Sequence, residues 1–405
     1  MSAYLTRAKL LLATHRPVDA EREARTGLEQ NPQNRELLHV LASALADQEK
    51  IPAAREVVQE LIGVAPSWAD AHLMLCYIEL ESKHYKKAEL AALDALRLAP
   101  DSAIAHQNLA VCYLRQQRWA EALEKAEAGL ALDAENTGCA NVRAIALSHL
   151  GRKLESTHSA DNALRRNPQS SQTQATAGFV QLAGGDHKRA LEHFAEALRL
   201  DPENDVARNG LVESLKARNP IYRALLGYSF WMRRLPPGRR WGVTLGALFI
   251  YNALGSMQNL GVWAAVITIV YLSFVMLTWV GSDFFNFVLL LDKAARHALD
   301  RRQRYGAVAL LLCLSSALGW FIAGVAWQKT DLFGTFPIIF YCIPLTRAFR
   351  KGSDWKAITR ISVAVLLGVS LVSCLAYLQL SGSEGPVSMV FMLTVLYTWL
   401  VRLLD

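Results

Sequence analysis

The chain has 405 residues, of which 52% are hydrophobic and 20% charged, and its formal net charge is +7. The charge is divided unevenly: residues 1–204 carry 23 basic and 27 acidic side chains, whereas the later residues carry 20 basic and 9 acidic ones. In the second half the basic residues form short clusters between apolar runs. This distribution is typical of a membrane surface and argues against a nucleic-acid partner.

The first half of the chain repeats with a period of 34 residues. Prolines mark the period, with Ala134 at the one position that lacks a proline: Pro32, Pro66, Pro100, Pro168 and Pro202. The blocks are residues 1–34, 35–68, 69–102, 103–136, 137–170 and 171–204. The eighth residue of each block is small, namely Ala8, Ala42, Cys76, Ala110, Ala144 and Gly178, and so is the twentieth, namely Ala20, Ala54, Ala88, Ala122, Ser156 and Ala190. Two small columns about half a repeat apart allow two antiparallel helices to approach closely, so each block is predicted to be a helical hairpin.

The fourth block shows the pattern best, in the stretch NLAVCYLRQQRWAEALEKAEAGLALDAEN. Its signature columns hold Leu109, Ala110, Tyr113, Trp119, Ala122, Gly129 and Leu130. This pattern resembles the tetratricopeptide repeat family, which implies an all-α solenoid over residues 1–204. Residues 205–220 then read as a capping helix that covers the last apolar face with Leu211 and Leu215.

Six apolar runs follow a basic juxtamembrane elbow at 221–240, and they predict a six-span transmembrane helical bundle over 241–405. The runs are 241–256, 260–280, 306–327, 333–346, 361–380 and 387–401. Two of them, 241–256 and 333–346, are short for a span, so re-entrant segments stay an alternative.

Basic residues occur in alternate connections, which predicts that both termini and the repeats lie in the cytoplasm. The side chains expected to face an anionic inner leaflet are Arg233, Arg234, Arg239, Arg240, Arg301, Arg302, Arg304, Arg350 and Lys351. The arrangement resembles bacterial membrane-anchored tetratricopeptide proteins, which implies the inner (plasma) membrane.

The family's geometry implies a concave wall built from the first helix of each hairpin. Apolar residues on that face form a stripe with polar edges, which favours a protein or peptide partner. The candidate groove residues are His39, Asp47, Leu73, Tyr77, Leu80, Gln107, Val111, Leu114, Arg115, Asn141, Ile145, His149, Phe179 and Leu182. Alternatively, neighbouring inner helices of a tightly wound superhelix cover part of this stripe.

No phosphate loop, nucleophile elbow or metal-ligand spacing occurs in the sequence, so neither an enzyme nor a cofactor is expected. His72 and His106 share one repeat column, but stacked column residues touch whether or not they bind a metal, and no metal site is expected. The sequence favours a scaffold that recruits a partner to the membrane. Six spans exceed what anchoring needs, so a channel, transporter or lipid-handling module regulated by the repeats is the alternative.

Overall fold

The structure, a computed structural model, describes residues 3–235, 239, 281–292, 296–300, 303–308 and 310–311. These residues form helices and turns, without a strand, as the sequence predicts. The chain divides into two compact units, Met1–Ala207 and Arg208–Asp405, and each is considered by itself.

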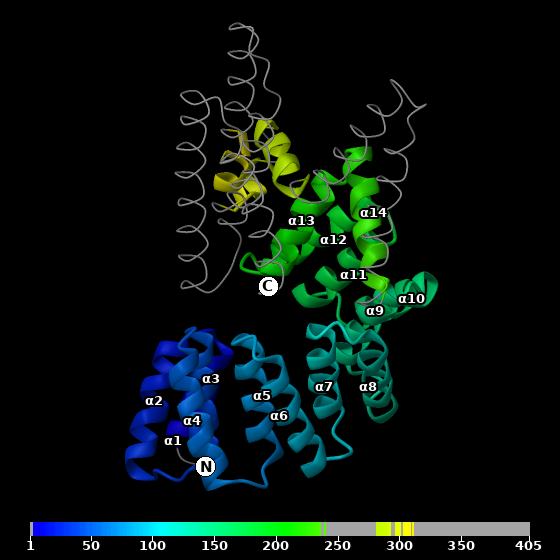
Figure 1. Cartoon of the computed structure of the whole chain (residues 1–405). Helices are drawn as coiled ribbons and strands as arrows, with labels where there is room; N and C mark the ends of the chain where they lie inside the picture. Colours follow the sequence, from blue (N-terminus) through cyan, green and yellow to red (C-terminus); the bar gives the residue numbers. More distant parts are fainter. Residues whose placement is uncertain are drawn as a thin grey trace, which may run out of the picture. The chain divides into compact units, whose positions relative to one another are not determined.

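The first unit contains two antiparallel helices per 34-residue block, stacked in chain order (Figure 1). The helices are α1 (Ala3–Ala13), α2 (Pro17–Gln30), α3 (Arg35–Asp47), α4 (Ile51–Val64), α5 (Ala69–Glu81), α6 (Tyr85–Leu98), α7 (Ala103–Arg115), α8 (Trp119–Leu132), α9 (Thr137–Leu150), α10 (Lys153–Arg166), α11 (Ser171–Ala183) and α12 (His187–Leu200). The all-α repeat fold expected for this part of the chain is therefore confirmed.

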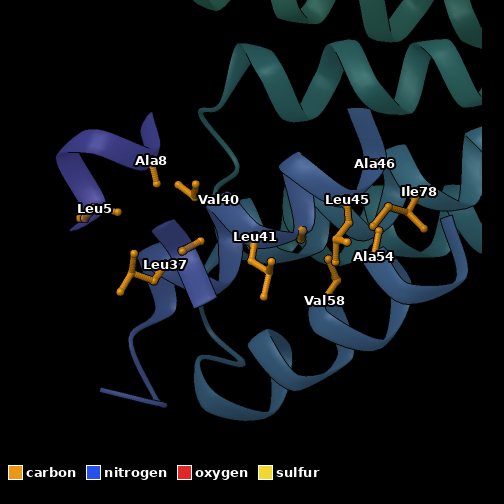
Figure 2. Close-up of a cluster of buried hydrophobic side chains, with 12 residues drawn as sticks. Leu5, Ala8, Leu37, Val40, Leu41, Leu45, Ala46, Ala54, Val58 and Ile78 are labelled. Atoms are coloured by element: carbon orange, nitrogen blue, oxygen red, sulfur yellow. The ribbon is translucent and has the colours of Figure 1, made fainter. Parts of the chain in front are cut away.

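The two small columns lie in the core, where the helices of each hairpin cross. Every residue in the eighth and twentieth columns is buried, from Ala8 and Ala20 in the first block to Gly178 and Ala190 in the last. Around them larger side chains of successive blocks pack in one cluster, which Figure 2 shows with Leu5, Leu37 and Ile78. Burial of these apolar side chains stabilises the stack, and each hairpin relies on its neighbours for it.

The turn between the two helices of each hairpin has one backbone conformation throughout. The fifteenth residue of each block has a positive φ, between 55° and 92°: His15, Glu49, Lys83, Gln117, Gly151 and Gly185. The amide of the next residue then reaches back to a carbonyl of the first helix, for example Lys50 N to Leu45 O at 2.9 Å. Only two of the six are glycine, so four turns hold a side chain in the left-handed region, at a cost of roughly 1–2 kcal/mol each.

Polar side chains join successive repeats at fixed columns. Glu21 of α2 accepts hydrogen bonds from Gln48 (2.9 Å) and Lys50 (3.0 Å) in the next block. Burial alone would raise the pKa of Glu21, but the bonds from Lys50 and Gln48 outweigh it and hold the pKa at about 2. The same columns make the same contact two blocks later, between Glu89, Gln116 and Arg118.

In the block between these two contacts, the column of Glu21 and Glu89 holds the cation Arg55 in place of a carboxylate. Arg55 of α4 donates to Glu79 Oε1 (2.7 Å) and to Ser82 Oγ (2.7 Å), and Nδ1 of His84 lies 2.8 Å from Glu79 Oε2. Glu79 is only 4% exposed. Burial raises the pKa of this carboxyl, but the bonds from Arg55 and His84 prevail and lower it, so Glu79 stays ionised.

In the second unit, α14 (Pro220–Arg234) shows that the predicted basic elbow begins as a helix, with Asn219 capping its first turn. Residues 281–291 form another helix. A buried polar network joins these elements: Lys216 donates to Glu213 (2.9 Å) and Ser282 (3.1 Å), and the Tyr222 hydroxyl also bonds Glu213. The Tyr222 ring packs edge-on against Phe285, with centroids 4.8 Å apart.

Helix α13 (Asp205–Lys216) occupies the segment expected to cap the repeats. Within the second unit its buried apolar residue is Val212, which packs with Leu289 and Leu299, while Leu215 is partly buried against the same cluster. Leu211, expected to face inward, is only half-buried. The apolar face of this helix therefore serves the second unit, and capping of the repeats stays a prediction.

Most residues of the predicted spans lie outside the described part of the chain. Of the third run, only residues 306–308 and 310–311 are described. Among the helices that are described, none has both the length and the apolar character that crossing a bilayer requires. Arg234, Arg239 and Arg304 are exposed, and the side chains of the other predicted membrane-surface residues lie outside the described part: Arg233, Arg240, Arg301, Arg302, Arg350 and Lys351. The transmembrane bundle therefore stays a prediction from the sequence.

Candidate peptide-binding groove

The first helices of successive hairpins contact one another and form one continuous wall of the array. The contacts run from α3 to α5, from α5 to α7, from α7 to α9 and from α9 to α11. All predicted groove residues lie on these five helices, so the fold brings them onto a common wall.

At the α3–α7 end this wall carries accessible apolar surface. Tyr77 is 41% exposed. Four aliphatic side chains around it are half-buried: Leu73, Leu80, Val111 and Leu114. Leu80 and Leu114 rest on the cluster that contains Leu109 and Leu147, so their inner sides are fixed by the core. Asp47 and Arg115 are exposed at one edge of this surface, where α3 and α7 end.

His39 and Gln107 are half-buried polar residues of the same wall. The His39 ring lies 5.5 Å from the Trp68 ring, between their centroids, and burial lowers its pKa from the ordinary value of 6.5. His39 is therefore neutral at pH 7. Gln107 packs over Gly138, where an added Cβ would lie 2.1 Å from the Gln107 amide oxygen.

At the α9–α11 end of the wall, neighbouring side chains cover several of the predicted groove residues. Asn141, His149 and Leu182 are buried, although the stripe expected from the sequence includes them. Asn141 donates to Thr173 Oγ1 at 3.2 Å, which fastens α9 to α11. Ile145 and Phe179 stay half-buried. The bond from Asn141 to α11 agrees with the alternative raised by the sequence, in which neighbouring inner helices cover part of the stripe.

The imidazole of His149 is covered on its face by Trp119, with ring centroids 3.9 Å apart and planes 9° apart. Phe179 approaches the same imidazole with a centroid separation of 5.4 Å. Trp119 begins the second helix of its hairpin, so the residue pattern of the first helices gave no sign that it would cover this position. The stack replaces an open groove by a packed aromatic cluster.

Two acidic residues that the stripe omitted also lie on these helices. Glu81 ends α5 and occupies the same repeat column as Asp47 and Arg115, so that column alone could have identified it. Asp70 lies in the first turn of α5. Burial raises the pKa of the Tyr77 hydroxyl, and the charges of Glu81 and Asp47 raise it further. The carboxylates of Glu81 and Asp47 therefore both act on this side chain.

The shared histidine column makes no metal site in the part of the chain that is described. Nε2 of His72 lies 3.0 Å from the carbonyl oxygen of Pro66, and so this ring is engaged by the backbone. No group of three or more potential metal-ligating side chains occurs among the described residues.

Part of the first unit matches a known protein family model. Residues 5–71 and 73–137 match the family model described as tetratricopeptide repeat. No curated protein sequence matches the chain.

Solved structures that the chain resembles over part of its length include three with low sequence identity. The Cut9–Hcn1 hetero-tetramer of the APC/C is 14% identical, with a TM-score of 0.47 over 52% of this chain and 42% of that one. YrrB, described as a tetratricopeptide repeat protein with an unusual peptide-binding site, is 17% identical, with a TM-score of 0.33 over 46% of this chain and 96% of that one. PilF of Pseudomonas aeruginosa is 19% identical, with a TM-score of 0.42 over 51% of this chain and 94% of that one.

The family match ends at residue 137, whereas the hairpins continue to α12 with the same buried columns. Residues 5–71 and 73–137 are thus similar to tetratricopeptide repeats, and the α-solenoid of the first unit continues the same hairpin pattern beyond them.

Proposed function

We propose that the chain is a non-enzymatic scaffold whose repeats bind a protein or peptide segment on the wall of α3, α5 and α7. The observation that carries the proposal is the accessible apolar surface around Tyr77. The inner side of this wall packs against the hydrophobic core. A rigid wall loses little conformational entropy when a segment binds, which favours recognition of an extended or helical peptide.

We further propose that the chain is anchored in a membrane. Six uncharged or nearly uncharged apolar runs alternate with basic connections, and this supports an integral protein of the bacterial inner membrane with its repeats in the cytoplasm. Basic side chains of the elbow and connections would then contact anionic lipids of the inner leaflet. In this arrangement a partner bound on the wall is recruited to the membrane.

Photo-cross-linking in native membranes tests the proposed binding wall. A benzophenone amino acid at Tyr77 is expected to give discrete cross-linked bands, because this side chain is exposed on the wall. The same amino acid at Glu60 is the matched control, since Glu60 is exposed on α4, which is not one of the wall helices. Introducing Val111→Arg on the wall that carries the Tyr77 probe should abolish its bands. Equal bands from both probe positions, or bands that persist with arginine at residue 111, would contradict a binding role for this wall.

A further inference from the structure

The accessible part of the wall is acidic as well as apolar. Asp47 and Glu81 end α3 and α5 in the same repeat column, one block apart, and Asp70 begins α5. These helices contact each other directly. The Tyr77 ring therefore lies on a surface with carboxylates toward both ends of the same helices.

These three carboxylates have no hydrogen bond or ion pair within the described part of the chain. Glu36 on the same wall is different, because it pairs with Lys9 at 2.9 Å. His39 adds no positive charge at neutral pH, since burial lowers its pKa. Arg115, one block further along, is the nearest cation in the column of Asp47 and Glu81. The wall of α3 and α5 thus presents negative charge around an exposed aromatic ring, with His15 acting on Asp47 and Arg35 placed over the Trp68 ring at the opposite helix ends.

Such a surface discriminates between peptides by charge. A lysine or arginine side chain that approaches Tyr77 gains attraction from the carboxylates of Asp47 and Glu81 and from the face of the ring. An acidic side chain in the same place would meet two like charges, which is unfavourable. Apolar neighbours of the basic residue can meanwhile contact Leu73 and Leu80, which are half-buried on α5.

We infer that the wall selects a basic, apolar peptide segment of a partner protein, with a lysine or arginine held between Asp47 and Glu81 over Tyr77. The inference rests on the proposed function and specifies its ligand chemistry. It also gives an orientation, since the basic residue lies at the edge of the wall where α3 and α5 end.

Three synthetic fluorescent peptides test this selectivity on the full-length protein in detergent. They share one leucine pattern and carry lysine, glutamine or glutamate at every polar position. Fluorescence anisotropy should show the order lysine, glutamine, glutamate in decreasing affinity. The double change Asp47→Asn with Glu81→Gln should weaken lysine-peptide binding by about fivefold to thirtyfold, because each exposed charge pair contributes up to roughly 1 kcal/mol.

The matched control is Glu56→Gln with Glu60→Gln, which removes the same charge from the exposed face of α4. It should leave lysine-peptide affinity within about twofold of that of the unchanged protein, because charges outside the wall are screened. Any binding of the peptides to detergent micelles is the same in measurements on both variants. A difference in affinity between the two variants therefore reports the effect of the wall charges. If the control weakens binding as much as the wall variant, or if lysine and glutamate peptides bind equally, the charge inference is overturned. If all three peptides bind equally and Val111→Arg abolishes this binding, the proposed binding wall stands and only the charge inference fails. If no peptide binds, the result counts against both.

Discussion

Replacing Phe194 with alanine is expected to lower the free energy of unfolding of the last repeat by about 3–5 kcal/mol. Phe194 on α12 is 1% exposed and is the largest fully buried side chain among the described residues. Its ring lies against Gly178 of α11, where an added Cβ would come within 2.9 Å of the ring carbons. Truncation would leave a cavity that this rigid helix pair cannot fill. Hydrogen exchange of the α11 and α12 amides in the full-length protein measures the loss where it occurs.

The contact between Phe194 and Gly178 also predicts how substitutions at these two positions combine. In the unchanged protein Gly178→Ala should be destabilising, because the new methyl group meets the Phe194 ring. In the Phe194→Ala background the same change should be stabilising by up to about 1 kcal/mol, since alanine is the better helix former and the ring is gone. If Gly178→Ala has the same sign in both backgrounds, the close packing described here is wrong.

The second large effect is expected for Arg55→Met, at about 3–5 kcal/mol. This change removes the guanidinium that bonds Glu79, and the carboxylate would be left buried with His84 as its nearest charged or chargeable partner. A charge held away from water without its partner is costly, whereas the lost ion pair itself contributes less. Hydrogen exchange of α4 and α5 amides measures the effect. Lys9→Met is the control, because its pair with Glu36 is largely exposed and should contribute no more than about 1 kcal/mol.

The Arg55→Met prediction also has a pH signature. The folded-state pKa of Glu79 is lowered, so its stabilising contribution is present above the ordinary carboxyl pKa and is lost as the pH falls through the folded pKa. Without Arg55, burial dominates and raises the pKa of Glu79, so acid protonates it readily and removes the buried charge. The difference in stability between the two proteins should therefore shrink as the pH falls from 7 toward about 4. A difference that stays constant or grows would mean that Glu79 does not carry the buried charge.

The arrangement of the repeats could be predicted closely because it depends on side-chain size at a fixed period. Ala8 and Ala20, with their equivalents in later blocks, are small because two backbones cross there, and all of them are buried. The pairing of Gly178 with Phe194 follows the same logic. The column of Phe194 otherwise holds only alanine or valine, and the large ring occurs where the facing residue has no side chain.

Other features depend on neighbours that a single column does not reveal. Glu49, Lys83 and Gln117 occupy left-handed turns that usually favour glycine, because the helices on either side fix the turn geometry. The closure of the groove over His149 depends on Trp119, which belongs to the other helix set. The accessible wall is consequently shorter than the apolar stripe in the sequence, and its acidic character comes from Asp70 and Glu81 as well as from Asp47.

In the proposed function, the binding wall is held at a membrane on its cytoplasmic side. Alkaline phosphatase inserted into the full-length chain in a bacterial host tests this directly, because the enzyme is active only outside the reducing cytoplasm. Insertion between Arg301 and Arg302 is predicted to give an inactive fusion, and insertion at Gln258, in the connection between the first two apolar runs, an active one. An active fusion at Arg301, or equal activity at both positions, would contradict the account.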